Sequence, residues 1–289
     1  MGIASGCGAA GGPAAASGKL VVIAAESHWG SIAAQLGGDR VAVQSIVASP
    51  STDPHDYEPT AADARSVAGA RMAIVNGVGY DAWAARLLGA SPSPGRVVLD
   101  VGRLVGVAAG GNPHRWYSPA DVHRVIDAIT ADYRRLDPTH ATYFAKRKAR
   151  FEQVALAPYR RVIAGIRARY GGTPVGASES IFALLAPELG LRLITPKAFL
   201  NAVSEGTDPT ARDKATVDRQ IAARQIAVWV YNSQNAPPDI ERLNAAARRA
   251  GIPIATVTET QTPANVTFQS WQVRQLRALA GALAKATGR

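Results

Sequence analysis

The sequence predicts an α/β protein of two lobes joined by one long helix. At 289 residues, 47% of them hydrophobic, the chain is longer than one average domain and can fill more than one core. Short runs rich in β-branched residues alternate with segments of helical periodicity, which is typical of parallel sheets covered by helices. Between two such stretches, residues 139–170 keep apolar side chains at helical spacing, enough for a helix of roughly 45 Å.

The first stretch of alternation ends before residue 139. Its β-branched or alternating runs predict four strands, at residues 19–25, 40–47, 72–76 and 97–101. The segments between and after them predict helices at residues 31–36, 60–70, 81–88 and 120–136. Thr60 and Pro119 stand at the predicted starts of two of these helices, where a hydroxyl cap and a proline are favourable.

The second stretch of alternation follows Gly171-Gly172. It predicts strands at residues 174–177, 192–195, 226–231 and 252–257, and helices at residues 181–189, 216–223, 237–250 and 271–287. Pro158 lies inside the long predicted helix and is expected to kink it, because proline has no N–H group to donate. We therefore expect four parts: a flexible tether at residues 1–18, an N-terminal α/β lobe at 19–138, a linking helix at 139–170 and a C-terminal α/β lobe at 171–289.

Two histidines stand directly after prolines on loops. His55 lies in STDPHDYEPTAAD (residues 51–63), and His114 lies in NPHRWYSP (residues 112–119). The prolines exclude both segments from helix or strand interiors, so each loop presents an imidazole. Imidazole is the commonest metal ligand, and a ligand must be held in place before the metal arrives. The repeated pattern therefore indicates a metal site, although one such histidine alone is as easily explained by a hydrogen bond to the backbone.

Two glutamates follow predicted strands of the second stretch. Glu179 comes after the strand at 174–177, and Glu259 comes after the strand at 252–257. Ligands of open parallel sheets bind beyond the carboxyl ends of the strands, which is where these side chains are expected. Each alone is also consistent with a solvated surface group. The same ambiguity holds for possible outer partners of the site, namely His28, Asp56, Glu58 and Glu205, whereas His123 and His140 are expected to face solvent on or beside helices.

The single cysteine, Cys7, excludes an internal disulfide framework and a multi-cysteine zinc site. The segment Ser5-Gly6-Cys7 precedes a Gly/Ala/Pro/Ser-rich stretch and resembles a bacterial lipoprotein cleavage box, in which the cysteine is lipidated. Residues 1–4 lack the charged and apolar regions of a secretory signal, so we expect a longer natural precursor. The alternative is an ordinary N-terminus with an incidental cysteine.

The net charge of +10 comes from 32 Lys and Arg against 22 Asp and Glu. The basic residues are spread along helical segments without interleaved aromatics, and no nucleic-acid motif accompanies them, so we expect no nucleic-acid partner. Solvated helix faces or attraction to an anionic membrane surface account better for the charge. No apolar run reaches the roughly 20 residues that a membrane-spanning helix needs.

The motifs quoted above, together with NGVGYDAW at residues 76–83, VYNSQ at 230–234 and VTET at 257–260, resemble those of a known family. This family is the metal-binding solute-binding proteins of bacterial ABC importers for zinc and manganese, and the resemblance extends from about Lys19 to the C-terminus. It implies two Rossmann-like parallel-sheet lobes, a rigid joining helix and one metal ion between the lobes. The ligand positions of the family match His55, His114, Glu179 and Glu259. Residues 102–111 contain no histidine, so the histidine-rich loop of many zinc members is absent.

The resemblance implies an extracytoplasmic, non-enzymatic protein that captures Zn²⁺ or Mn²⁺ and delivers it to an ABC permease. It would be a monomer held at the outer face of the cytoplasmic membrane by a lipid on Cys7. Two imidazoles and two carboxylates suit either ion, and intrinsic affinity favours zinc at any such site, so the ligands do not name the metal. Alternatives are a receptor for another solute, an adhesin of the same architecture, or a zinc hydrolase, for which the sequence lacks a compact motif such as HExxH.

Overall fold

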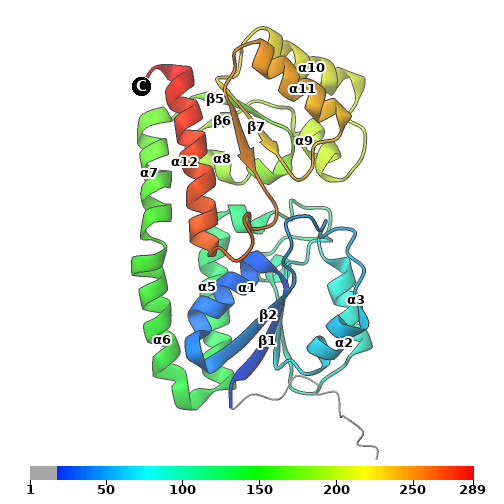
Figure 1. Ribbon diagram of the computed structural model, residues 1–289, viewed down its shortest axis with the longest axis vertical. Coiled ribbons are helices and arrows are strands. Elements are labelled where there is room, and N and C mark those ends of the chain that lie inside the picture. Colours follow the sequence, from blue (N-terminus) through cyan, green and yellow to red (C-terminus); the bar gives the residue numbers. More distant parts are fainter. Residues whose placement is uncertain (1–17) are drawn as a thin grey trace, which may run out of the picture.

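A computed structural model describes residues 18–289, and Cys7 with its cleavage-box motif lies outside this range. The described chain forms two parallel four-stranded sheets with the strand orders β2-β1-β3-β4 and β6-β5-β7-β8 (Figure 1). The strands of the N-terminal sheet are β1 (Leu20–Glu26), β2 (Val41–Val47), β3 (Met72–Val75) and β4 (Val97–Asp100). Those of the C-terminal sheet are β5 (Pro174–Ala177), β6 (Arg192–Leu193), β7 (Val228–Asn232) and β8 (Ile254–Val257). The predicted α/β class with two parallel sheets is confirmed.

Helices cover both sheets. Around the N-terminal sheet lie α1 (Ser27–Gly37), α2 (Ala61–Ala68), α3 (Ala82–Ala90), α4 (Val101–Val105) and α5 (Pro119–Leu136). Around the C-terminal sheet lie α8 (Leu185–Glu188), α9 (Lys197–Ser204), α10 (Ala211–Ala222), α11 (Pro238–Arg249) and α12 (Phe268–Thr287). Within the described residues, no helix is both long enough and apolar enough to cross a membrane.

The start of α2 shows how the sequence sets a helix boundary next to the His55 loop. The hydroxyl oxygen of Thr60 accepts a hydrogen bond from the backbone N–H of Asp63, and the Asp63 carboxylate accepts one from the backbone N–H of Thr60. This reciprocal cap satisfies donors that the first turn of a helix leaves free. Tyr57 donates a further hydrogen bond to Asp63, so the end of the His55 loop is fastened to the helix that follows it.

The predicted joining helix consists of two α-helices with one wide turn between them. α6 (Ala141–Arg150) and α7 (Ala157–Tyr170) run along one side of the molecule past both sheets, and residues Phe151–Ala155 form a π-helical turn (Figure 1). The N–H of Leu156 donates to the carbonyl of Phe151, five residues earlier, at 2.9 Å. Pro158 has no N–H to continue the regular pattern, and the irregularity predicted there begins about two turns earlier, at Phe151.

Several short elements differ from the predictions. The helix predicted at residues 181–189 is wrong: the segment forms a 3₁₀ turn at Ser180–Phe182 and the single turn α8, which contains Pro187. The predictions include neither α4 nor α9. The helix predicted at 216–223 starts earlier, because the Thr210 hydroxyl accepts a hydrogen bond from the N–H of Asp213 and caps α10 there.

One hydrophobic cluster passes through both halves of the molecule. It contains Val22 of β1, Phe144 of α6, Val230 of β7 and Leu283 of α12, all buried. The last helix, α12, packs along α7 and also contacts α1 beside the N-terminal sheet (Figure 1). The two sheets are therefore joined by shared packing as well as by the α6–α7 connection.

Candidate metal centre

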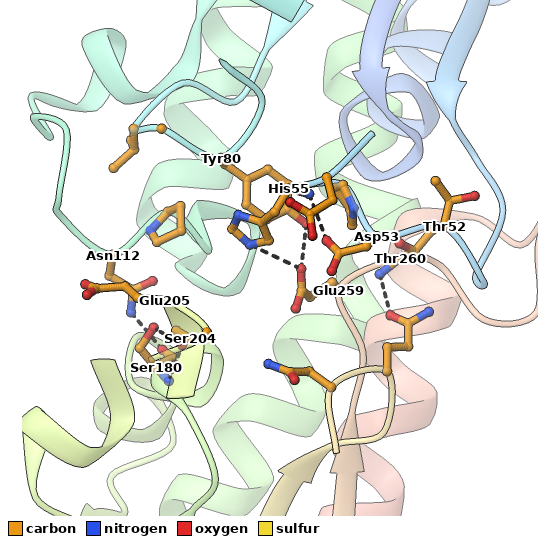
Figure 2. A pocket seen from close by; sticks show the side chains of 18 of the residues that line it. Thr52, Asp53, His55, Tyr80, Asn112, Ser180, Ser204, Glu205, Glu259 and Thr260 are labelled. Carbon is orange, nitrogen blue, oxygen red and sulfur yellow. Dashed lines mark hydrogen bonds and ion pairs between the residues drawn. The ribbon is translucent and has the colours of Figure 1, made fainter. Parts of the chain in front are cut away.

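The carboxyl ends of both sets of strands face each other (Figure 1). A cleft of about 650 Å³ lies between them, and Figure 2 shows side chains that line it. Loops that follow β2, β3, β7 and β8 line it, which is the usual position of a ligand site in open parallel sheets. Its lining includes four carboxylates, and no Lys or Arg among the described residues, although the whole chain carries a net charge of +10. The four acidic residues of the lining are Asp53, Asp56, Glu205 and Glu259.

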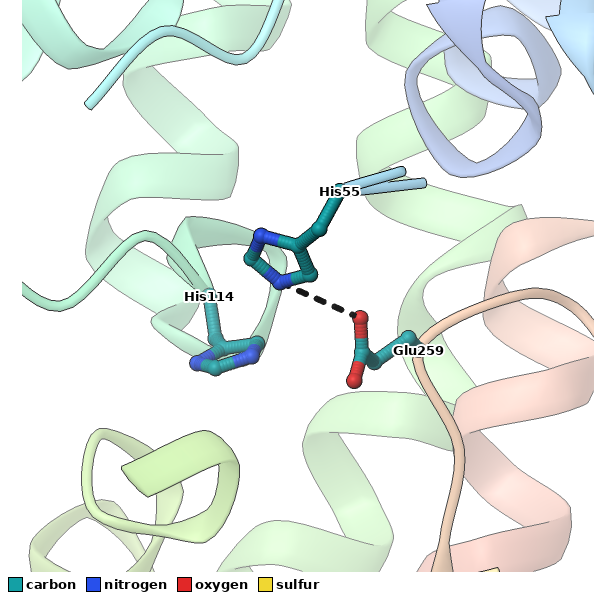
Figure 3. A group of neighbouring side chains, drawn as sticks. All are labelled: His55, His114 and Glu259. Atoms are coloured by element: carbon teal, nitrogen blue, oxygen red, sulfur yellow. Dashed lines mark ion pairs between the residues drawn. The ribbon is translucent and has the colours of Figure 1, made fainter. Parts of the chain in front are cut away.

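Three of the four predicted ligands meet at the wall of this cleft: His55 and Glu259 line it, and the buried His114 directly follows the lining residue Pro113. His55, His114 and Glu259 each offer one ligand atom, and these atoms all lie within 4.8 Å of one another (Figure 3). The Nε2 atom of His55 is 3.8 Å from Oε2 of Glu259. Ligand atoms around a tetrahedral zinc ion lie roughly 3.3 Å apart at bond lengths near 2 Å, so a small contraction would suffice.

The loop of His55 is held by its neighbours on both sides. The backbone N–H of His55 donates to Oδ1 of Asp53 at 2.8 Å, and the indole of Trp83 donates to the carbonyl of Pro54 at 3.0 Å. The imidazole meets the ring of Tyr80 edge-on, with 4.5 Å between the ring centres. About a third (34%) of the His55 side chain remains exposed, so this imidazole is fixed yet reachable from solvent.

His114 is buried and oriented by Asn112. The Asn112 side-chain oxygen accepts a hydrogen bond from the backbone N–H of His114 and lies 2.9 Å from its Nδ1 atom. When Nδ1 donates to that oxygen, Nε2 keeps the lone pair that a metal requires. Burial, followed by the nearby charge of His55, lowers the pKa of His114 to about 3. The imidazole is therefore neutral at pH 7.

Glu259 is positioned from both sheets. Its Oε2 atom accepts a 2.9 Å hydrogen bond from the hydroxyl of Tyr80, which follows β3, and its Oε1 atom accepts a 2.8 Å hydrogen bond from the side chain of Asn232, at the end of β7. Burial raises the pKa of Glu259, while the charge of His55 and the hydrogen bonds oppose the rise. The carboxylate is thus well oriented but costly to ionise without a cation.

Glu179, the fourth predicted ligand, lies outside the group of three and is 1% exposed. Its Oε2 atom accepts a hydrogen bond from the side chain of Asn235 at 2.8 Å, and its Oε1 atom is buried without a partner among the described residues. Burial, followed by the negative charge of Glu259, raises the pKa of Glu179 to about 8. A buried carboxylate oxygen without a donor is unfavourable, and a cation between the two glutamates would satisfy it.

The remaining histidines do not join the group. His28 is buried, stacks on Trp116 with 4.0 Å between ring centres, and has no hydrogen-bond partner for either ring nitrogen in the described chain. Burial lowers its pKa, so it is a neutral aromatic of the wall behind His114. His123 lies 3.7 Å from Glu152 and His140 lies 2.8 Å from Asp137, both away from the cleft as expected. Of the acidic outer candidates, Asp56 and Glu205 line the cleft and Glu58 does not.

Sequence reasoning missed the side chains that hold the predicted ligands in place. Tyr80 and Asn232 both bind Glu259, and Asn112 orients His114 while donating through its amide to the carbonyl of Ser180 across the cleft. The sequence signal that could have identified them is their position in the quoted motifs. Tyr80 and Asn232 lie after or at the end of a strand, and Asn112 lies two residues before His114. Hydrogen bonds between residues as distant as Tyr80 and Glu259 leave no local pattern.

Two parallel sheets of one strand order, with a histidine and carboxylate cleft between their carboxyl edges, define the architecture of a two-lobed solute-binding protein. The chain belongs to the ZnuA family, described as zinc-uptake complex component A, periplasmic, whose model matches residues 22–282.

Relatives and solved structures agree with this assignment. The chain is 28% identical to the manganese-binding lipoprotein MntA of Halalkalibacterium halodurans over 49% of this chain and 48% of that protein. It is 22% identical to the zinc-binding lipoprotein AdcA of Streptococcus pneumoniae over 91% of this chain and 56% of that protein. The chain thus spans about half the length of these curated relatives.

Among solved structures, a Cd-bound periplasmic metal binding protein from Candidatus Liberibacter asiaticus superposes with a TM-score of 0.75 at 17% identity, covering 92% of this chain and 100% of that one. The Mn²⁺ complex of FpvC from Pseudomonas aeruginosa gives a TM-score of 0.72 at 21% identity, covering 92% of this chain and 98% of that one. These likenesses confirm the fold.

Proposed function

We propose that this protein captures one divalent transition metal ion, Zn²⁺ or Mn²⁺, outside the cytoplasm and delivers it to the permease of an ABC importer. The observation that carries the proposal is the meeting of His55, His114 and Glu259 within 4.8 Å at a cleft whose described lining contains no Lys or Arg. Membership of a zinc-uptake family and relatives named for binding manganese or zinc support it.

The proposed ligand set is His55, His114, Glu179 and Glu259. Imidazole binds a metal in its neutral form, so two carboxylates compensate the charge of a divalent ion. The unpartnered Oε1 atom of Glu179 supplies the fourth donor once it moves toward the other three. Four single contacts suit tetrahedral Zn²⁺, whereas bidentate carboxylates would give Mn²⁺ a larger coordination number.

Binding without catalysis is the role that these residues favour. A zinc hydrolase needs an open coordination position and a separate general base beside it. Here both glutamates are proposed as ligands, and the hydroxyl of Tyr80 is already committed to Glu259. Neither an adhesin nor a receptor for an organic solute would need two buried carboxyl groups of raised pKa beside a neutral imidazole such as His114.

We also propose the arrangement around the site. Residues 1–18 form a tether lipidated at Cys7 of the precursor, residues 19–138 and 171–289 form the two lobes, and residues 139–170 link them. The protein acts as a monomer at the outer face of the cytoplasmic membrane. The relatives named as metal-binding lipoproteins support this location.

Calorimetry on the metal-stripped protein tests the function. Zn²⁺ and Mn²⁺ should each bind with a stoichiometry of one, and both should raise the melting temperature, while sugars and amino acids should leave it unchanged. Stabilisation by an organic solute with no response to either metal would overturn the proposal.

A further inference from the structure

One end of the N-terminal sheet carries a row of basic residues. The residue directly before each of its four strands is Lys or Arg, and across the sheet, in the order β2-β1-β3-β4, these residues are Arg40, Lys19, Arg71 and Arg96. All strands of a parallel sheet begin at one edge, so the four cations lie along that edge. We call this set of four residues the basic edge.

The strand register fixes the order of this row. Leu20 pairs with Val41, which places Lys19 beside Arg40, and Met72 pairs with Val97, which places Arg71 beside Arg96. Val22 pairs with Met72, so the Lys19–Arg40 pair extends two residues beyond the Arg71–Arg96 pair. Neighbouring strands are about 4.8 Å apart, so the four backbone positions span roughly 15 Å. Like charges on adjacent strands repel each other, and this arrangement therefore lowers stability unless an anion compensates it.

The described part of the chain supplies little compensation. None of the four basic-edge residues lies within ion-pairing distance of a described carboxylate, and the acidic residue in the adjoining loops is Asp39. Lys19, Arg40 and Arg71 are exposed, whereas the guanidinium of Arg96 is held by the carbonyls of Ala70 and Ser91.

The neighbouring turn between α5 and α6 adds further positive charge. Arg134 is exposed there without an ion pair in the described structure, while Arg135 pairs with Asp132 and His140 lies beside Asp137.

The C-terminal sheet provides an internal comparison because it has the same strand order. The residues directly before its four strands are Thr173, Leu191, Ala227 and Pro253, none of which is charged. The row of cations is therefore a property of one sheet and does not follow from the architecture.

The chain enters the described structure at this same edge. Gly18 and Lys19 immediately precede β1, so the described chain begins at the edge of the N-terminal sheet that carries the basic residues (Figure 1). The metal cleft lies at the opposite, carboxyl edge of the same sheet. A membrane anchor on the N-terminal side of Gly18 would bring the basic edge to the lipid surface first.

We infer that, between deliveries to the permease, the basic edge docks on anionic phospholipid headgroups, so that the protein stands on the membrane with its cleft open to the surrounding medium. The inference rests on the proposed function only for the presence of a membrane anchor. Each Lys or Arg near an anionic surface contributes about fivefold in partitioning, equivalent to roughly 1 kcal/mol, and salt weakens this within a Debye length.

Sedimentation with vesicles tests the inference on the full unlipidated chain. The protein should bind vesicles of mixed phosphatidylglycerol and phosphatidylcholine, bind pure phosphatidylcholine vesicles far less, and dissociate with added salt. The variant K19Q/R40Q/R71Q should lose about a hundredfold in partitioning, since three cations are removed. The control R212Q/R248Q/R249Q removes three exposed arginines of C-terminal helices that make no ion pair within the described residues, and it should bind like the parent.

Three results would overturn the inference: equal binding by the basic-edge variant and the parent, an equal loss in the control, or equal binding to both kinds of vesicle. Inorganic phosphate at a concentration matched for ionic strength should compete no better than chloride, because better competition would mean that the edge binds free phosphate instead.

Arg71→Gln alone, with an expected loss of about fivefold, gives a second reading if the triple variant folds poorly. Zn²⁺ calorimetry on the same variants separates this inference from the proposed function, since metal binding should be unchanged in all of them.

Discussion

The hydroxyl of Tyr80 donates a 2.9 Å hydrogen bond to Oε2 of Glu259, a residue 179 positions later in the chain. Tyr80 follows a strand of the N-terminal sheet and Glu259 follows a strand of the C-terminal sheet, so this bond crosses the cleft (Figure 2). The ring of Tyr80 also contacts the imidazole of His55. One side chain therefore orients two proposed ligands that come from different sheets.

Replacing Tyr80 with Phe should weaken metal binding by about 10-fold to 100-fold, the usual effect of removing a partner that orients a ligand. The ring contact with His55 would persist, so the loss would report the hydroxyl. Tyr133→Phe is the matched control, because its buried hydroxyl donates to the carbonyl of Ala33 away from the cleft. Calorimetric titration with Zn²⁺ measures both variants, and equal affinities would show that the Tyr80 hydroxyl has no part in the site.

Replacing either His55 or His114 with Ala should weaken Zn²⁺ binding by at least about 100-fold. Removing a residue that only orients a ligand costs up to about 100-fold in metal affinity, and here a proposed ligand itself is lost. The double variant should show no calorimetric binding. His123→Ala, a histidine of α5 that lies near Glu152, is the control. Parent-like affinity in the double variant would place the metal site elsewhere.

Metal binding should release protons at neutral pH. Burial raises the pKa of Glu179 to about 8 and also raises that of Glu259, so the metal-free site holds a proton at pH 7 that the ion must displace. Affinity should then rise about tenfold per pH unit for each proton released, up to about pH 8. Titrations in buffers of different ionisation enthalpy measure the number released.

The alternative is competition by the imidazoles, which would make affinity fall mainly below the ordinary histidine pKa of about 6.5. For His114 its buried position argues against such competition, because a pKa of about 3 keeps that ring neutral through this range. A flat affinity between pH 7 and pH 8, with no buffer dependence of the heat, would contradict control by the glutamates.

The metal-free protein should become less stable as pH rises from about 4.5 to about 8. The folded state keeps a proton on Glu179 to about pH 8, whereas the unfolded state loses it near the ordinary value of 4.5, so the unfolded state is favoured as pH increases through this window. Glu179→Gln should raise the melting temperature at pH 8 without metal and weaken Zn²⁺ binding. Glu241→Gln, an exposed change on α11, should do neither.

Saturating metal should raise the melting temperature without a large change of shape. The ion would stabilise the folded state by about 4 kcal/mol at a thousandfold excess over Kd. Packing of α12 against both α7 and α1 limits rotation of one sheet relative to the other. Small-angle scattering should therefore give nearly the same radius of gyration with and without Zn²⁺, and a strong compaction would contradict this restraint.

The fold could be predicted largely because each buried strand is a short β-branched run bounded by turns, as MAIVN in β3 and IAVWVY in β7 show. The failures are short elements whose conformation depends on the rest of the molecule. Residues 181–189 have helical composition, but packing of Ile181 and Phe182 into the core and Pro187 within the segment divide them. A helix as short as α4 is stabilised mainly by its surroundings.

The candidate site could be predicted in part because a proline before a histidine is a local signal, and His55 and His114 do lie together. Whether Glu259 lies near these histidines depends on the position of β8 in its sheet, which local sequence patterns do not give. The resemblance to the family was needed to predict it. The deeper position of Glu179 depends on tertiary packing and on Asn235, so no local pattern reveals it. The ligand role of all four residues remains a prediction.

The hydrophobic cluster shared by β1, α6, β7 and α12 also bears on how the protein unfolds. Separate cores would let each sheet melt on its own, whereas one continuous core transmits the loss of either sheet to the other. Calorimetric heating should accordingly give one endotherm whose van't Hoff and calorimetric enthalpies agree. For the same reason, expressing either half of the chain alone would expose core surface along α7 or α12, and neither fragment would reach the native state.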